Sequence, residues 1–295
     1  MFDYRYHALS LAAVLFALAL GVLIGVAIGD SNLVSSAKSG IVSNLNSELN
    51  ASRTQSGQVQ QHLQTQEAAT KGLYPLAVHD LLLGRSIGLV FLGQSSDQVN
   101  ALVRGAVTQA GGEVASVLAV REPLELASIG HEASGTHYAQ LEGSVALVQR
   151  FGEIVGRELV GGGPLVGHDL LSRVSHSLLS AFDGQLTRQE GIVVMRAEPS
   201  GMTPAQSEAA AAFETGMLQG VAAAGVPAVG VELTGTEPSQ ITWYKGKDIA
   251  SVDNLDETTG QASLDYALAG SRGAYGVKGT AESLVPTLTA GSQAP

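Results

Sequence analysis

The N-terminal end of the chain contains the feature that most constrains its fold. Residues 8–28 form an uncharged apolar run, whereas the remainder of the chain is polar and acidic. A helix of this length spans roughly 30 Å, which matches the hydrocarbon core of a bilayer. We therefore predict a transmembrane helix within residues 1–29. A cleaved signal peptide is the alternative, because Ala27 and Gly29 have the small-residue spacing of a cleavage site, but the length of the run disfavours it.

The charges beside this run predict its orientation. Arg5 and the terminal amine outweigh Asp3 before the run, whereas Asp30 follows it and the next lysine is Lys38. Positive charge favours the cytoplasmic side of a membrane. We expect a single-pass protein of the cell membrane with a cytoplasmic N-terminus and an extracytoplasmic C-terminal domain.

Composition excludes several classes of protein. The chain has 27 acidic residues against 16 lysines and arginines, which argues against nucleic acid as a partner, because phosphate backbones attract basic surfaces. It has no cysteine, which excludes a disulfide scaffold and a thiolate metal site.

Small residues in the predicted span indicate helix association. Gly21, Gly25 and Gly29 recur every four residues on one helix face, where two backbones can approach closely. This pattern predicts a dimer face in the membrane. The alternative is that glycine is simply common in transmembrane helices.

Residues 30–72 are predicted to form a coiled-coil stalk that continues this dimer. The segment contains no proline, and its apolar residues fall at helical spacing on one stripe. The predicted seam consists of Ile41, Leu45, Leu49, Val59 and Leu63. The eleven-residue spacing of Ile41, Ser52 and Leu63 favours a straight or right-handed supercoil. Because Ser52 and Ser56 make the seam polar, a loosely helical single stalk is the alternative.

Residues 73–288 are predicted to form an extracytoplasmic α/β domain, followed by a flexible tail at 289–295. Short apolar runs alternate with helical patterns, which is typical of a three-layer domain with a mainly parallel sheet. The predicted strands are 87–92, 114–120, 192–195 and 229–233.

Helix signals lie between these runs. We predict capping boxes at Ser95 with Gln98, at Thr203 with Gln206, and at Thr258 with Gln261. A helix is also predicted to carry Leu170, Leu171, Val174, Leu178 and Phe182.

Catalytic motifs are absent from the sequence. Residues 93–96 link a predicted strand to a helix but lack the glycine pattern and lysine of nucleotide loops. No Gly-x-Ser-x-Gly elbow is present either. We therefore expect no enzyme activity and no cofactor.

The candidate metal ligands are weakly grouped. His131 and His137 form one loose pair and His168 and His176 another, but neither pair has the spacing of a known metal motif. Without cysteine, and with scattered methionines, a high-affinity copper(I) site is not expected. The acidic residues Asp253, Asp256 and Glu257 are interpreted as a turn before a helix, with a weak hard-cation site as the alternative.

Two parts of the sequence carry a family resemblance. The N-terminal part is Arg5, Tyr6, His7 and Ser10 with the following apolar run and Gly21 and Gly25. The C-terminal part is Ser251, Val252, Asp253, Asn254, Leu255 and Asp256, then Gly260, Gly273, Ala274, Tyr275 and Gly276. Together they resemble the actinobacterial MctB-like family, the mycobacterial copper transport protein B family.

This resemblance implies two roles. One is copper homeostasis, described as efflux through a pore in the outer envelope. The other belongs to the SteB cell-division branch, whose dimeric coiled-coil protein works with a cytoplasmic SteA partner to control a peptidoglycan hydrolase. A transmembrane barrel needs many alternating strands with aromatic girdles, and only 5% of this chain is aromatic. The sequence itself therefore favours a homodimeric scaffold over a pore.

Overall fold

The computed structural model describes residues 4–29, 31–161, 169–185, 187–197 and 200–287, with the side chains of 31–34 and 37 left out. The predicted tail at 289–295 and His168 lie outside these ranges. The chain divides into two compact units, Met1–Glu67 and Ala68–Pro295.

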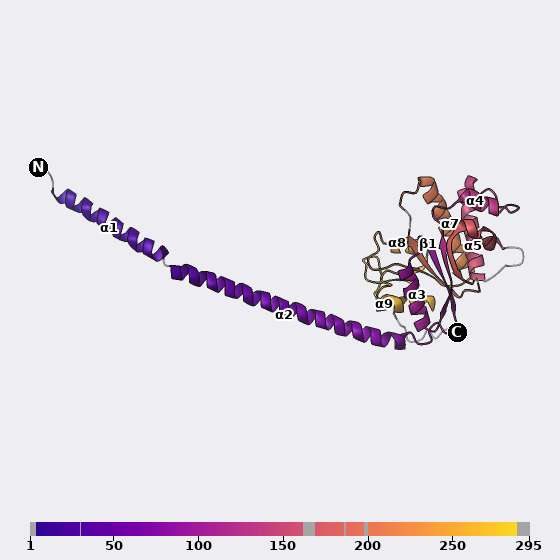
Figure 1. The fold of residues 1–295 in the computed structure, drawn as a ribbon, viewed down its shortest axis with the longest axis horizontal. Coiled ribbons are helices and arrows are strands. Elements are labelled where there is room, and N and C mark those ends of the chain that lie inside the picture. Colours follow the sequence, from indigo (N-terminus) through magenta and orange to yellow (C-terminus); the bar gives the residue numbers. More distant parts are fainter. Residues whose placement is uncertain (1–3, 30, 162–168, 186, 198–199, 288–295) are drawn as a thin grey trace. The chain divides into compact units, whose positions relative to one another are not determined.

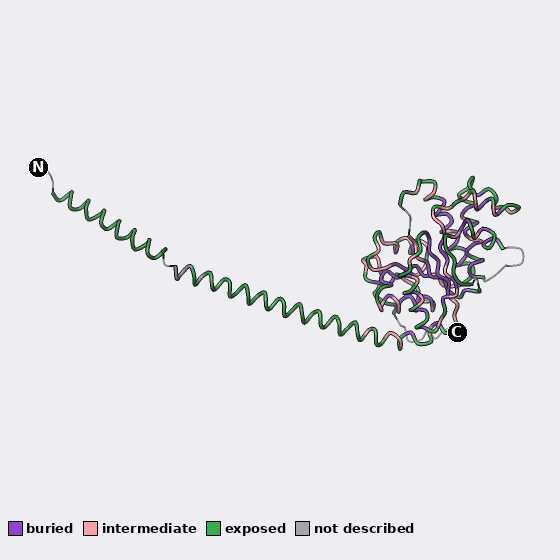
Figure 2. Tube along the Cα trace, viewed as in Figure 1, coloured by how far each residue is buried: buried purple, intermediate pink, exposed green. Residues whose placement is uncertain are grey.

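The first unit contains helix α1 and most of helix α2. Helix α1 spans Tyr4–Gly29, and by length and composition it is the one described helix that could cross a membrane. Helix α2 spans Ser31–Ala77, so it continues beyond the predicted stalk boundary at residue 72. Figure 2 shows α1 exposed throughout, in agreement with the absence of buried residues in this helix.

The second unit is a mixed α/β domain built on a seven-stranded sheet with the order β3-β2-β1-β4-β5-β6-β7. Strand β3 runs antiparallel to β2, and the other pairs are parallel. This confirms the predicted mainly parallel sheet. The strands are β1 Ser86–Gly93, β2 Glu113–Val120, β3 Leu179–Gly184, β4 Gly191–Ala197, β5 Ala228–Val231, β6 Ala250–Val252 and β7 Ala274–Tyr275. The helices are α3 Asp97–Gln109, α4 Leu126–Glu132, η1 Leu141–Gly143, α5 Val145–Gly161, α6 Leu170–Leu178, α7 Pro204–Ala223, α8 Ile241–Lys245 and α9 Thr258–Leu268 (Figure 1).

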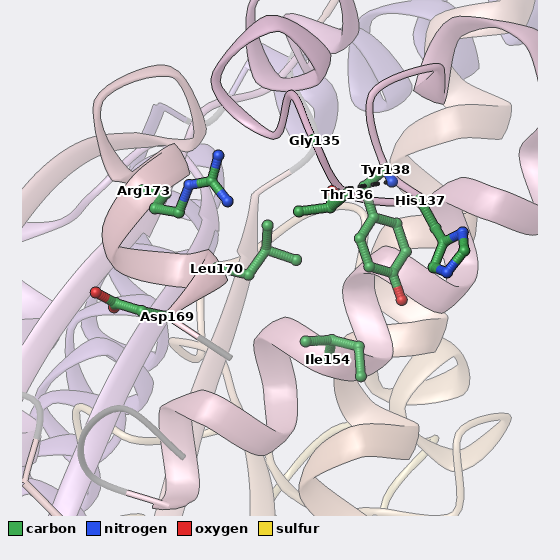
Figure 3. A pocket seen from close by; sticks show the side chains of 8 residues that line it. All are labelled: Gly135, Thr136, His137, Tyr138, Ile154, Asp169, Leu170 and Arg173. Carbon is green, nitrogen blue, oxygen red and sulfur yellow. Dashed lines mark hydrogen bonds between the residues drawn. The ribbon is translucent and has the colours of Figure 1, made fainter. Parts of the chain in front are cut away.

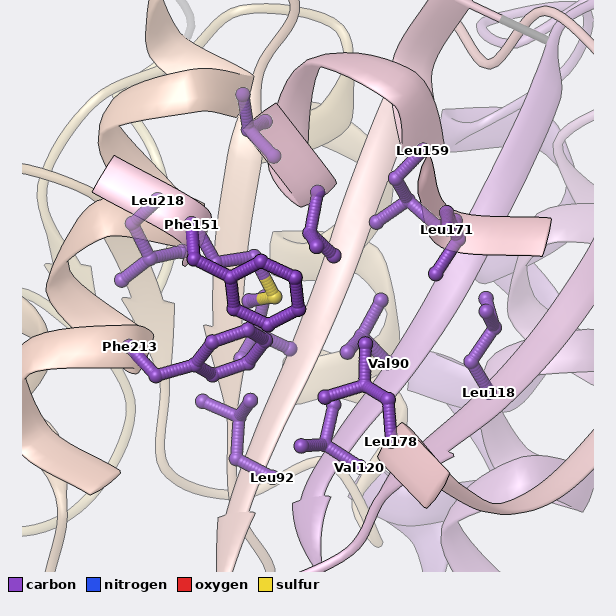
Figure 4. Packing of buried hydrophobic residues seen from close by; sticks show 14 of the residues in the cluster. Val90, Leu92, Leu118, Val120, Phe151, Leu159, Leu171, Leu178, Phe213 and Leu218 are labelled. Carbon is purple, nitrogen blue, oxygen red and sulfur yellow. The ribbon is translucent and has the colours of Figure 1, made fainter. Parts of the chain in front are cut away.

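Both faces of the sheet carry a buried apolar cluster. Successive strand residues point to opposite faces, so Val90 and Leu92 of β1 join one cluster and Leu89 and Phe91 join the other. Helices α4 to α8 contribute to the first cluster, and Figure 4 shows some of its residues that lie on β1, β2, α5, α6 and α7. Helices α3 and α9 and residues 78–82 contribute to the second cluster.

Helices α5 and α7 pack with their backbones in contact. A Cβ added to Gly152 or Gly156 of α5 would lie 2.3 or 2.1 Å from a carbonyl oxygen of α7. The same addition to Gly216 or Gly220 of α7 would come within 1.8 or 2.1 Å of a carbonyl oxygen of α5. Only glycine permits this approach. The close packing of α5 and α7 therefore depends on two Gly-x-x-x-Gly patterns, which the sequence-based predictions did not include.

Three local predictions are wrong. The N-cap of α3 is Ser96, whose hydroxyl accepts from the Val99 amide, and not Ser95. Phe182 lies on β3, because α6 ends at Leu178 and the chain turns into an edge strand. The N-cap of α9 is Glu257, without a side-chain cap bond, so Thr258 and Gln261 form no capping box. By contrast, the capping box of Thr203 and Gln206 is confirmed.

Candidate functional site

The carboxyl edge of the parallel strands is the place where doubly wound α/β folds bind ligands, at the point where strand order reverses. Here that point lies between β1 and β4. A Cβ on Gly93, the last residue of β1, would lie 2.3 Å from the Ala197 carbonyl oxygen and 3.4 Å from Oε2 of Glu122. The protein's own backbone and a carboxylate fill this position. The geometry therefore favours a structural turn at 93–96 over a phosphate-binding loop.

A buried ion pair lies at the end of β4. Nε of Arg196 is 2.8 Å from Oε1 of Glu214 on α7, and Nη1 donates to Oε1 of Gln240 at 2.8 Å. The guanidinium carbon also lies 4.9 Å from the ring centroid of Trp243, whose other cationic neighbour is Lys247 at 5.4 Å. The Tyr244 hydroxyl accepts from the Arg196 amide at 2.9 Å, and burial raises the pKa of this phenol, so it stays protonated.

A second buried ion pair closes the edge after β5. Glu232 accepts from the Lys278 ammonium at 2.6 Å, from the Ser239 hydroxyl at 2.7 Å and from the backbone N–H of Gln240 at 2.6 Å. Both carboxylate oxygens are thus engaged. Lys278 lies in the segment that follows β7, so its bond to Glu232 holds that segment against the carboxyl edge of the sheet.

The acidic residues of the C-terminal family segment, Asp253 and Asp256, accept hydrogen bonds from backbone amides. Asp253 accepts from the Val277 and Lys278 amides at 2.7 and 2.9 Å. A Cβ on Gly276, which has a φ of 138°, would lie 1.8 Å from Oδ1 of Asp253. This position therefore requires glycine. Asp256 accepts from the amide and hydroxyl of Thr234 at 2.7 and 2.9 Å.

Asn254 anchors the start of α9. Its Nδ2 donates to Oε2 of Glu257 at 3.0 Å and to the Thr259 hydroxyl at 3.1 Å. A Cβ on Gly260 would lie 1.9 Å from the Asn254 carbonyl oxygen. These contacts favour the predicted turn over the weak hard-cation site, because a cation would have to compete for carboxylates that already accept internal hydrogen bonds.

A cavity of about 460 Å³ lies between the segment after α4 and helices α5 and α6 (Figure 3). Tyr138, Ile154 and Leu170 surround the hollow, with Arg173 and Asp169 on one side and His137 on the other. Gly135 and Thr136 complete the lining.

Two polar side chains of this cavity donate hydrogen bonds to backbone carbonyl oxygens. Nη2 of Arg173 donates to the carbonyl oxygens of Glu132 and Ser134 at 3.2 and 2.8 Å. The Thr136 hydroxyl donates to the Ala133 carbonyl oxygen at 2.7 Å. Burial raises the pKa of Tyr138 and thereby keeps its phenol neutral. The lining therefore combines apolar side chains with the Arg173 cation, which is bonded to the backbone of residues 132 and 134.

The family model described as "Copper transport outer membrane protein, MctB" matches residues 1–286. The chain belongs to the MctB family. No curated protein matched the chain in a separate comparison. The MctB match covers both units, so it confirms the resemblance carried by the two signature segments.

The MctB description directs attention to the candidate copper ligands. His131 lies on α4, His137 follows that helix and His176 lies on α6, and all three are exposed. Met217 is buried in the apolar core. The described residues contain no group of three or more His, Cys, Asp or Glu side chains able to hold a metal ion. In this part of the chain, copper handling therefore has no preformed ligand cluster.

The remaining predicted residues lie on α1, α2 and β7. Arg5, Tyr6 and His7 occupy the first turns of α1, where the His7 carbonyl oxygen accepts from the Ser10 hydroxyl at 3.0 Å. Gly21, Gly25 and Gly29 have no heavy atom within 4 Å of an added Cβ. Tyr275 of β7 donates to the Arg272 carbonyl oxygen at 2.7 Å. The sequence did not single out Arg196, Glu214, Glu232 and Lys278, whose only sequence signal was a charge within or beside predicted strands and helices.

Proposed function

We propose that this MctB-family protein is a single-pass, dimeric scaffold of the cell envelope that acts in copper homeostasis without being an enzyme. Helix α1 is the membrane anchor, with its N-terminus in the cytoplasm. Helix α2 is a coiled-coil stalk, and the second unit is a three-layer α/β domain outside the cytoplasm. The copper role is supported by the family description.

The exposed apolar stripe of α2 carries this proposal. In the single chain, Ile41 is 61% exposed, and Leu45, Leu49, Val59 and Leu63 are 50–53% exposed. A second copy of α2 would cover the stripe and remove this apolar surface from water. The glycine face of α1 would bring the two chains together in the membrane, which raises the effective concentration of the stalks.

The domain is suited to holding partners. Its carboxyl edge is closed by the Arg196–Glu214 and Lys278–Glu232 pairs. Carboxylates engaged in this way are poorly placed to act as general acids or bases. The domain would then contribute to copper tolerance through binding to other envelope proteins.

Copper tolerance of cells lacking the native gene tests this proposal. We expect Leu45→Asp to dissociate the dimer, because it places a charge in the apolar seam, and to abolish tolerance. Ser43→Asp adds the same charge on the opposite face of α2, because Ser43 is two helical positions from Leu45, and it should preserve both properties. Replacing His131, His137, His168 and His176 together by Ala should leave tolerance intact. Loss of tolerance in that folded, dimeric variant would contradict the scaffold mechanism and favour direct copper binding.

The SteB-like role is the second candidate function. In it the dimer couples a cytoplasmic SteA-like partner to a peptidoglycan hydrolase during cell division. It is favoured by the lack of a metal-binding group among the described residues. Under this function, Gly25→Leu and Leu45→Asp should produce cells that fail to separate while copper tolerance stays normal. Unchanged cell separation in both variants would exclude it.

A further inference from the structure

The last turns of α2 dock on α9 through two tyrosines. The Tyr74 hydroxyl donates to Oδ2 of Asp265 at 2.8 Å, and the Tyr266 hydroxyl donates to the Ala77 carbonyl oxygen at 2.7 Å. Tyr74 belongs to α2, whereas Asp265 and Tyr266 belong to α9. All of these residues lie within the unit Ala68–Pro295. The end of the stalk helix is therefore fastened to the domain from both sides of the contact.

Asp265 is an unusual partner for such a contact. Its side chain is fully buried, and Oδ1 has no hydrogen-bond partner among the residues that the structure describes. An ionised carboxylate in this place receives one hydrogen bond, where water would supply several. Burial therefore raises the pKa of Asp265 from 3.8 to about 7, although the hydrogen bond from Tyr74 opposes this shift. Burial, and after it the contact with Asp265, raises the pKa of Tyr74, so the phenol remains the donor.

Among the described residues, no charged side chain on the elements packed against α9 bonds to Asp265. On α2, Lys71 is exposed to solvent. Strands β5 and β6 carry no titratable side chain. On α3, Asp97 is exposed and Arg104 bonds to Asn100, Asp183 and the Val114 carbonyl oxygen. Arg85 donates to the Leu268 carbonyl oxygen at 3.0 Å, one turn further along α9. Tyr74 is therefore the titratable group that bonds Asp265.

We infer that Asp265 and Tyr74 form a proton-sensitive latch that holds the end of α2 on the domain when Asp265 is neutral and loosens when it ionises. The docked carboxyl has a pKa above that of a free one. The latch is therefore fully stabilised below about pH 4, weakens as the pH rises and reaches its weakest state above about pH 7. The latch is independent of the proposed function. Its use in relaying external pH to a stalk-borne scaffold rests on that function.

Hydrogen exchange of the full chain in detergent tests the latch. The measured quantity is the protection factor of the amides at 68–78, which corrects for the intrinsic effect of pH on exchange. In the native sequence we expect protection to fall at least tenfold between pH 5 and pH 8, since one pKa unit corresponds to a tenfold change in equilibrium constant. Asp265→Asn keeps an acceptor for Tyr74 and cannot ionise, so its protection should be the same at both pH values.

Two further variants complete the experiment, one as a control and one as a second test. Tyr266→Phe removes the hydrogen bond to Ala77, so protection should fall equally at both pH values while the pH dependence persists. Tyr74→Phe removes the hydrogen bond that lowers the Asp265 pKa, so the midpoint of the transition should move to higher pH. This second variant keeps the inference testable if Asp265→Asn does not fold.

Three results would overturn the latch: a native chain without pH dependence, an Asp265→Asn variant with native pH dependence, or an unchanged midpoint in Tyr74→Phe. The outcome is separable from the scaffold proposal. A Leu45→Asp chain that is monomeric should still show the pH-dependent protection of residues 68–78.

Discussion

The two units of the chain treat apolar side chains in opposite ways. Helix α1 has no buried residue, and the apolar seam of α2 is at least half exposed. In the domain, Phe151 and Phe213 are fully buried and their ring centroids lie 5.8 Å apart. The domain therefore buries these apolar side chains against one another. The apolar side chains of the first unit can be buried only against something outside the chain. In our proposal this is a bilayer for α1 and a second stalk for α2.

Breaking a buried ion pair should have the largest effect on the domain. We expect Arg196→Ala to lower the free energy of unfolding by about 3–5 kcal/mol, because it leaves Glu214 buried without its cation. Urea unfolding followed by circular dichroism measures this change. Lys245→Ala removes the exposed pair with Glu282 and should cost less than about 1 kcal/mol. Equal losses of unfolding free energy in the two variants would contradict the prediction that the buried pair contributes more to stability than the exposed pair.

A smaller effect is expected where α5 and α7 touch. Gly156→Ala places a Cβ 2.1 Å from the Met217 carbonyl oxygen and should cost about 1–3 kcal/mol by overpacking. Gly105→Ala is the matched control, because Gly105 is an exposed helical glycine with open space around it. It should stabilise the domain by up to about 1 kcal/mol. If both changes stabilise the domain, backbone contact between the helices is not required.

The smallest effect on the domain should come from the stalk. Leu45→Ala is expected to change the free energy of domain unfolding by less than about 0.5 kcal/mol, because Leu45 has no buried contact in the single chain. Sedimentation of the same variant should nevertheless show a weaker dimer. Leu178→Ala, at a fully buried position of the domain, should cost about 2–5 kcal/mol. A large loss in Leu45→Ala would show that the two units are not independent.

Local signals explain which parts of the fold could be predicted. Strands β1, β2, β4 and β5 follow from apolar runs, and the α7 cap follows from Thr203, Pro204 and Gln206. Strand β3 could not be predicted, because five of its six residues are exposed and the four-residue spacing from Leu178 to Phe182 also suits a helix. The capping box predicted for α9 is wrong because the hydrogen bonds of the Asn254 side chain, and not a capping box, organise that turn.

The ion pairs of the carboxyl edge depend on contacts far apart in sequence. Arg196 and Glu214 are 18 residues apart, and Glu232 and Lys278 are 46 apart. Their pairing follows from strand order and from the return of the C-terminal segment, neither of which is encoded by spacing. The acidic signature could be located by sequence, but its role in holding the amides of residues 277 and 278 required the fold.

The position of Trp243 gives the molecule an optical property. It is the only tryptophan in the chain, and both the Arg196 guanidinium and the Lys247 ammonium lie close to its ring. Indole fluorescence depends on nearby charge and on water, so opening of the carboxyl edge will change the emission of this ring. The native chain thus carries an intrinsic fluorophore that reports on the edge of the sheet and not on α1 or α2, which contain no tryptophan.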